Sequence, residues 1–368
     1  MKRILLFGII LCMLLSGCSW MGGSYVSVTP HQEQRANTQT AVISARNYLQ
    51  LTDALTDMIA EGTESAAINV AEYPPETVEN GMAVAIGRAM KNDPIGAYAV
   101  EKIEYDLGTS AGQPALAVKI LYRHSRVEIK RMDRIEQMDE VQPIVKRALQ
   151  NYDTSTAMLV ENYQEIDFSQ IVAELVRDNP QTLMEVPQVS VETYGSGSRK
   201  VVELKFTYTT NRETLRQMQS QVKPVFDAAV LYVKGGTSDE QKFSQLYSFL
   251  MERFDYRLES SLTPTYSLLH QGVGDSSAFA TVYAAMCRAA GLECMVVIGT
   301  YENEPRAWNI VLDNGYYYHV DLLQCSERGR YAERTDWQMS GYTWDQGVYP
   351  VCAGVPGEAT EIEETKEK

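Results

Sequence analysis

The stretch GVGDSSAFATVYAAMCRAAGLEC, residues 272–294, decides how the carboxy-terminal part of this chain folds. Its glycines precede Asp275, Ser276 and Ser277, which favour a helix start because their side chains accept hydrogen bonds from the free amides of a first turn. Apolar side chains then follow at helical spacing: Phe279, Val282, Tyr283, Met286 and Ala290. The pattern predicts a turn, a helix headed by Ser276 and the entry into a strand.

A further helix and three strands are predicted around this segment. SDEQKFSQLYSFLMERFDY, residues 238–256, begins with capping residues and continues with apolar residues at helical spacing. Three strand-like runs follow the central helix: MVVIGTY at 295–301, RAWNIVL at 306–312 and YYYHVDL at 316–322. Asn314-Gly315, between the last two runs, predicts a two-residue hairpin turn.

The helix, RAWNIV and YYYHVDL, in that order, resemble the transglutaminase-like fold of the papain-like cysteine proteases over about residues 236–325. In that family a cysteine heads the helix, a histidine opens the next catalytic strand as His-Ala-Trp-Asn, and an aspartate ends the following strand as His-Val-Asp. The resemblance places the cysteine at Ser276, the histidine at Arg306 and the aspartate at Asp321. Two of the three triad positions are therefore changed.

These changes remove the groups that the family's reaction uses. That reaction needs a thiolate nucleophile and an imidazole that accepts and returns a proton. A serine hydroxyl is far less acidic than a thiol, and a guanidinium stays protonated and cannot act as a base. We therefore expect no catalytic residue in this degenerate triad, and we expect Ser276 to help cap its helix. Trp308 and His319 are the candidate binding residues, although a tryptophan here commonly packs beneath such a site.

The predicted hairpin also gives a geometric expectation. With Asn314-Gly315 as the turn, Trp308 stands opposite Asp321, so Arg306 becomes a diagonal neighbour of Asp321 on the same face. Their Cβ atoms would lie roughly 7 Å apart, within reach of a guanidinium that binds a carboxylate through two hydrogen bonds. The sequence thus predicts an ion pair between Arg306 and Asp321.

Two alternatives to an inactive binding domain stay open. One is an active hydrolase or acyltransferase in which Ser276 works with a rebuilt base, such as His319 or His270. The other is an assembly scaffold in which the cleft has no role.

Four cysteines remain once those of the leader are set aside: Cys287, Cys294, Cys325 and Cys352. They allow three disulfide pairings, and Cys325 with Cys352 is favoured because Cys287 lies on the buried helix face. Their spacing is not that of a metal site, so we expect no metal and no cofactor.

Upstream of this domain, two α+β modules are predicted, a first over 46–130 and a second over 131–235. Residues 103–122 align without gaps on 189–208, and both stretches contain Gly-Ser turn residues followed by an alternating apolar pattern, as in a hairpin. A helical segment precedes each hairpin. The predicted unit is helix, strand, helix, strand, strand, used twice, so the fold class of the whole chain is α+β.

The amino-terminal end of the chain indicates export. Residues 1–17 combine Lys2 and Arg3 with a short apolar run, as in a signal peptide, and Leu15-Ser16-Gly17-Cys18 resembles a bacterial lipobox. The resemblance implies that Cys18 carries acyl chains such as palmitate. Residues 18–45 are predicted to be a tether and 356–368 an acidic tail.

The chain carries a net charge of −15, which argues against nucleic acid as a partner. We expect a lipoprotein anchored to the cell membrane, whose transglutaminase-like domain over 236–355 binds cell-wall peptide or an envelope protein.

Overall fold

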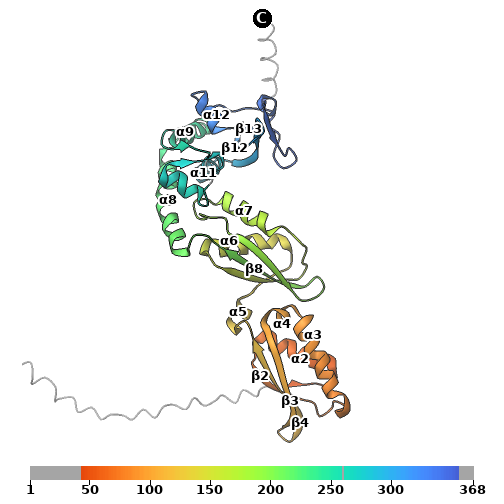
Figure 1. The fold of residues 1–368 in the computed structure, drawn as a ribbon. Helices are drawn as coiled ribbons and strands as arrows, with labels where there is room; N and C mark the ends of the chain where they lie inside the picture. Colours follow the sequence, from red (N-terminus) through yellow and green to blue (C-terminus); the bar gives the residue numbers. More distant parts are fainter. Residues whose placement is uncertain (1–42, 259–260, 356–368) are drawn as a thin grey trace, which may run out of the picture.

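The computed structural model describes residues 43–258 and 261–355 as three units that follow one another in a row (Figure 1). The predicted leader over 1–17 with Cys18, nearly all of the tether and the acidic tail lie outside the described residues. Of the predicted tether, Ile43–Ser44 form strand β1, which lies before the predicted boundary at 45/46. No helix in the described ranges is both long and apolar enough to cross a membrane.

The first unit, residues 43–131, is a four-stranded sheet with helices α2 and α3 packed together over it. The strand order is β1-β2-β4-β3, with β1 parallel to β2 and the other pairs antiparallel. Its elements are β1 Ile43–Ser44, α2 Tyr48–Glu61, β2 Ser65–Asn69, α3 Val78–Lys91, α4 Pro94–Ala99, β3 Val100–Ser110, β4 Gln113–Tyr122 and α5 Arg126–Arg131.

The second unit, residues 133–208, has the same topology. Its strand order is β5-β6-β8-β7, again with the first pair parallel and the others antiparallel. Its elements are β5 Asp133–Ile135, α6 Val141–Asn151, β6 Ser155–Val160, α7 Phe168–Asp178, β7 Gln188–Tyr194 and β8 Lys200–Thr207. Both units run helix, strand, helix, strand, strand, with a short parallel strand before the first helix.

The hairpins of the two units also share one register. Leu107 pairs with Leu116 in the first hairpin. The gap-free alignment of 103–122 on 189–208 carries these residues onto Thr193 and Val202, which pair with each other in the second hairpin. The alternating apolar pattern thus placed both hairpins correctly on their sheets.

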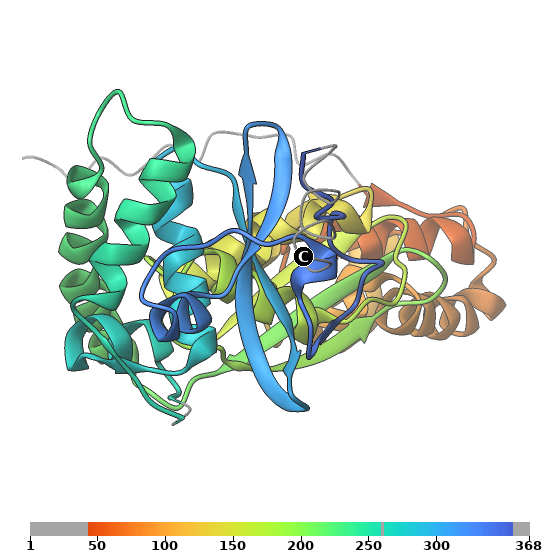
Figure 2. The same ribbon diagram turned by 90° about the horizontal axis from the view of Figure 1, so that it is seen from above.

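The third unit, residues 212–355, contains the segment that opened the sequence analysis. Strands β13-β12-β11-β14 form an antiparallel sheet, and the central helix α11 packs against β11 and β12 (Figure 2). Its helices are α8 Arg212–Tyr232, α9 Asp239–Met251, α10 Pro264–Tyr266, a π-helical turn Ser267–Gln271, α11 Ser276–Ala289 and α12 Leu322–Glu327. Its strands are β9 Asp255–Tyr256, β10 Val273–Gly274, β11 Cys294–Tyr301, β12 Glu304–Asp313, β13 Tyr316–Val320 and β14 Tyr342–Trp344.

The predicted hairpin turn is present in this unit. Asp313 pairs with Tyr316, and both turn residues, Asn314 and Gly315, have positive φ values of 49° and 85°. Such a turn matches the right-handed twist of the strands that it joins, and glycine and asparagine adopt it readily.

Helix α8, which lies before the predicted boundary at 235/236, packs with the third unit. Leu215, Val222, Phe226 and Ala229 of α8 are buried in one core with α9 and α11. This packing was not visible in the sequence, where α8 simply follows the second hairpin.

Candidate functional site

Asp275 is the N-cap of helix α11, and its side chain accepts a hydrogen bond from the amide of Ala278 at 2.8 Å. Ser276 is the first residue of the helix, and its Oγ accepts a hydrogen bond from the amide of Ala307 on β12 at 3.2 Å. The expectation that Ser276 caps the helix is therefore wrong, since Asp275 does so. Ser276 instead joins the head of the helix to the strand that carries Arg306.

The predicted ion pair between Arg306 and Asp321 is confirmed. Nε of Arg306 donates to Oδ2 of Asp321 and Nη2 donates to Oδ1, both at 2.9 Å. The two side chains are 11% and 1% exposed, so solvent screens this pair little. In this bidentate geometry two N–H groups of the planar guanidinium each donate to one carboxylate oxygen.

The carboxylate of Asp321 has further partners. The strand pairing ends at Asn309 and Val320, and Asp321 becomes the N-cap of α12, accepting hydrogen bonds from the amides of Leu323 and Gln324 at 3.0 and 3.2 Å. The hydroxyl of Tyr342 donates to Oδ2 at 2.8 Å. Burial, together with the Asp321 carboxylate, raises the pKa of Tyr342 far above its usual range, so the phenol stays a donor. Asp321 is therefore fully occupied.

Trp308 and His319 lie beneath this pair. Both are completely buried, and Nε1 of Trp308 donates to Nδ1 of His319 at 2.9 Å. His319 must then carry its proton on Nε2, which lies 2.8 Å from Oδ1 of Asp336. Burial lowers the pKa of His319, against the opposing effect of Asp336, so this imidazole is neutral near pH 7. The two candidate binding residues thus contact each other and leave no surface to a ligand.

This arrangement does not provide the rebuilt base of the hydrolase alternative. Both ring nitrogens of His319 are engaged, by Trp308 and by Asp336, so neither offers a lone pair to Ser276. His270 stacks on Tyr266, with ring centroids 4.7 Å apart, and is exposed on the π-helical turn.

His319, Asp336 and Cys352 bring potential metal-ligand atoms within 4.8 Å of one another. A ligating histidine must present an unprotonated nitrogen to the ion. Here the Trp308 donor occupies the lone pair of Nδ1, which leaves the proton on Nε2. Asp336 also accepts a hydrogen bond from the amide of Cys352 at 3.1 Å. The three residues are therefore better described as a hydrogen-bonded cluster that holds the carboxy-terminal segment against β13 than as a metal site.

The favoured disulfide between Cys325 and Cys352 is wrong. Cys287, Cys294, Cys325 and Cys352 are all buried free thiols. Burial raises the pKa of Cys352 to about 12, so its thiol is inert as a nucleophile. Cys287 is completely buried in the core, as its place on the helix predicts.

Sequence reasoning missed Asp336 and Tyr342. Both lie in the segment after α12, which has little regular structure and therefore no apolar period to place it. Their contacts with His319 and Asp321 follow from the path of this segment across the sheet.

Comparison with known proteins is in keeping with this geometry. Residues 227–322 match the transglutaminase-like superfamily. No curated protein matches the chain. A solved transglutaminase structure is 11% identical, with a TM-score of 0.27, covering 71% of this chain and 77% of its own. A candidate cysteine protease from Cytophaga hutchinsonii is 12% identical, with a TM-score of 0.26, covering 42% of this chain and 70% of its own.

A candidate protease from Parabacteroides distasonis is 11% identical, with a TM-score of 0.22, covering 49% of this chain and 44% of its own. The assignment rests on the family match and on the order of helix, strands and triad positions, since likeness at these TM-scores adds no argument. Residues 227–322 are a transglutaminase-like domain.

Proposed function

We propose that the transglutaminase-like domain binds a ligand and does not catalyse acyl transfer. The observation that supports this is the bidentate pair of Arg306 and Asp321, which occupies the positions of the family's base and its orienting acid. A guanidinium cannot take a proton from a nucleophile, and Asp321 is saturated by hydrogen bonds. Ser276, at the nucleophile position, has a structural contact with Ala307 instead of a base.

We further propose that the ligand is cell-wall peptide or a protein of the cell envelope. Large apolar side chains are exposed on elements that adjoin the altered triad: Tyr256 is 39% exposed, Leu258 87% and Trp337 52%. Tyr256 lies on β9, which pairs with β10 just before Asp275, and Trp337 follows Asp336. Exposed aromatic and aliphatic side chains of this kind are typical anchors for a bound peptide.

The membrane location is proposed from the leader alone. A cysteine at 18 after a short apolar run supports cleavage and acylation there, and several acyl chains give stable anchoring where a single chain does not. Cells fed a labelled fatty acid should label the parent chain and not Cys18→Ser. Equal labelling of the two would remove the anchor from the proposal.

Catalysis is tested with the purified chain, an amine acceptor and peptide amide substrates. We expect no transglutaminase, amidase or peptidase turnover, and no labelling of Ser276 by a fluorophosphonate, read by mass spectrometry. Ser277→Ala serves as the matched control for Ser276→Ala, because Ser277 is the exposed neighbour. Labelling and turnover that disappear only in Ser276→Ala would replace this proposal with the hydrolase.

Binding is tested with an immobilised cell-wall stem pentapeptide and the purified chain. Trp337→Ser should weaken retention severalfold, because it removes an exposed aromatic anchor. Val127→Ser, an exposed apolar residue of the first unit at 55%, is the control and should not change retention. Equal retention of all three chains would exclude this surface as the binding site.

A further inference from the structure

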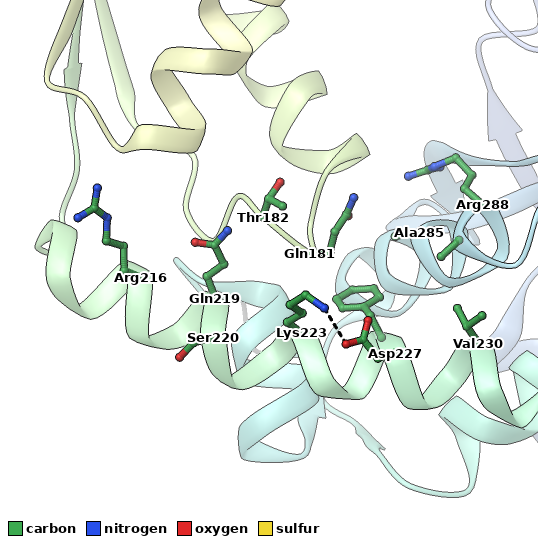
Figure 3. Close-up of a pocket in the computed structure, with 12 residues that line it drawn as sticks. Gln181, Thr182, Arg216, Gln219, Ser220, Lys223, Asp227, Val230, Ala285 and Arg288 are labelled. Carbon is green, nitrogen blue, oxygen red and sulfur yellow. Dashed lines mark hydrogen bonds and ion pairs between the residues drawn. The ribbon is translucent and has the colours of Figure 1, made fainter.

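A pocket of about 600 Å³ lies at the other end of α11 from Ser276 (Figure 3). Helix α8 forms one wall, the loop after α7 forms the second and the last turns of α11 form the third. Helix α11 has 14 residues, so the pocket and the triad positions are separated by about 20 Å along it. The volume is in the range of sites that hold small molecules.

The lining of this pocket is cationic. Arg216, Lys223 and Arg288 contribute three positive charges, and Asp227 is the one acidic residue of the lining, paired with Lys223 at 2.7 Å. Within the described residues, neither arginine forms an ion pair with a carboxylate. In a chain of net charge −15 this local excess is unusual, and an anion would be drawn to it.

Arg288 is held in place without being neutralised. Its Nη1 donates to the carbonyl of Cys294 at 2.9 Å and its Nη2 to the carbonyl of Asp178 at 3.0 Å. Carbonyl oxygens are neutral acceptors, so the guanidinium keeps its full charge beside the pocket. A cation fixed in this way needs little ordering when an anion binds.

The remaining lining divides into an apolar and a polar part. Phe226, Val230 and Ala285 give an apolar floor. Gln181 lies opposite α8, and its Oε1 is buried without a hydrogen-bond partner. A half-turn of this amide puts its NH₂ in the same place, where it can donate to a ligand. The site therefore offers donors and positive charge at its rim and apolar surface below.

We propose that this pocket binds a small amphipathic anion, a carboxylate or phosphate group carrying a short apolar chain. The head group would contact Arg216, and the chain would lie along α8 on Phe226 and Val230, while Arg288, at the other end of the pocket, would add its charge to the field that attracts the anion (Figure 3). This site is separate from the proposed peptide surface, so either can fail without the other.

The test is titration calorimetry of the full chain with octyl phosphate, with octyltrimethylammonium and octyl glucoside as cationic and neutral probes of the same chain length. We expect saturable binding of octyl phosphate that weakens as salt is added, and at least tenfold weaker binding of the other two. Equal binding of octyltrimethylammonium would overturn the proposal, because charge would then have no part.

Two substitutions locate the site. Arg216→Glu should weaken octyl phosphate binding at least tenfold, while Arg131→Glu, the same change at an exposed arginine of the first unit, should alter it less than twofold. Ala289→Trp should also weaken binding, because it fills the apolar part. Unchanged affinity in Arg216→Glu would overturn the assignment.

Two further arms distinguish the sources of such an anion. Binding of both octyl phosphate and phosphatidylglycerol vesicles, each lost in Arg216→Glu, assigns a lipid head group, whereas binding of octyl phosphate alone assigns a free metabolite. A synthetic peptide of residues 356–368 that binds more tightly than octyl phosphate would overturn the small-molecule proposal in favour of the chain's own acidic tail.

Discussion

At the scale of single residues, Arg306 forms a structural ion pair with Asp321 at the position where the family keeps a base. The buried pair with Asp321 contributes less than its Coulomb energy implies, because two charges had to leave water to form it. Removing one partner is a different matter. Asp321 would then be a buried charge with only neutral donors around it, the amides of Leu323 and Gln324 and the phenol of Tyr342.

Arg306→Ala should therefore lower the free energy of unfolding of the third unit by about 3 kcal/mol. Arg306→Lys should lower it by about half as much, since lysine keeps the charge but loses the bidentate geometry. Urea unfolding followed by tryptophan fluorescence reports this unit, because Trp308, Trp337 and Trp344 all lie in it.

The control for this pair is Lys223→Ala, in the same unit. Lys223 pairs with Asp227 at 2.7 Å, but their side chains are 69% and 62% exposed, so its loss should change stability by no more than about 0.5 kcal/mol. Equal losses at Lys223 and Arg306 would show that the buried pair does not hold the hairpin to α12.

His319 makes stability depend on pH. Its pKa in the folded chain is lowered from 6.5 by burial, so below pH 6.5 the unfolded chain binds a proton that the folded chain does not. Stability is full above pH 6.5 and falls as the pH drops toward the lowered pKa, by up to about 1.4 kcal/mol per pH unit. His319→Gln should lack this part of the slope between pH 7 and 5 in urea unfolding.

His270→Gln, the same change at an exposed ring, measures what the substitution itself does. A slope in His319→Gln as steep as that of the parent chain would mean that His319 is already protonated in the folded state. The hydrogen bond from Trp308 to Nδ1 would then be absent.

At the scale of elements, two neighbouring residues at the start of α11 make different contacts: one caps the helix and the other binds a strand. Asp275 accepts from the amide of Ala278 within the helix, whereas Ser276 reaches across to Ala307. Asp275→Ala should lower the free energy of unfolding by about 1 kcal/mol, and Asp275→Asn should retain most of it, because asparagine is also a good cap.

Ser277→Ala, at the exposed neighbour, is the control and should have almost no effect in the same urea titration. If Ser276→Ala lowered the free energy of unfolding more than Asp275→Ala, the hydrogen bond from Ala307 on β12 would stabilise this helix end more than the cap does.

How far the sequence predicts these elements depends on how local their signals are. The hairpin around Asn314-Gly315 and the ion pair across it follow from a turn type and a period of two, so both were predicted correctly. Asp336 and Tyr342 could not be, because nothing local in residues 328–355 fixes where that segment runs. The capping cluster of Asp275, Ser276 and Ser277 was predicted, but the local pattern suits each of the three and did not show that Asp275 is the cap.

At the scale of the whole molecule, the first two units are joined through a sheet that is buried on both faces. In the second unit, Leu159 and Val201 belong to the core of the first unit, while Met158 and Val202 belong to the core of the second. Adjacent residues of a strand point to opposite faces, so β6 and β8 serve both cores. The sequence of β6 ends in the apolar run Met158-Leu159-Val160, whereas β8 alternates after Val202, so neither pattern reveals what covers each face.

Val201 and Val202 therefore give a matched pair of substitutions, since both are completely buried valines on β8. Val201→Ala should raise amide hydrogen exchange in α2 and β4 of the first unit, and Val202→Ala should raise it in α6 and α7 of the second. Each loses two methyl groups from a packed core, which costs about 1 to 3 kcal/mol. The effect should spread furthest within the unit whose core has been opened.

The same pair shows whether the two units unfold together. If Val201→Ala raised exchange only around β8 and left α2 and β4 protected, the first unit would be stable without the surface that the second unit lends it. If both substitutions raised exchange equally in both units, the two cores would open as one cooperative block. We expect neither result, because α4 lies between the two cores and its Tyr98 contacts Tyr194 of β7 with ring centroids only 5.4 Å apart. That contact, together with Leu159 and Val201, couples the units along one face of β6 and β8 and leaves the rest of each core to its own helices.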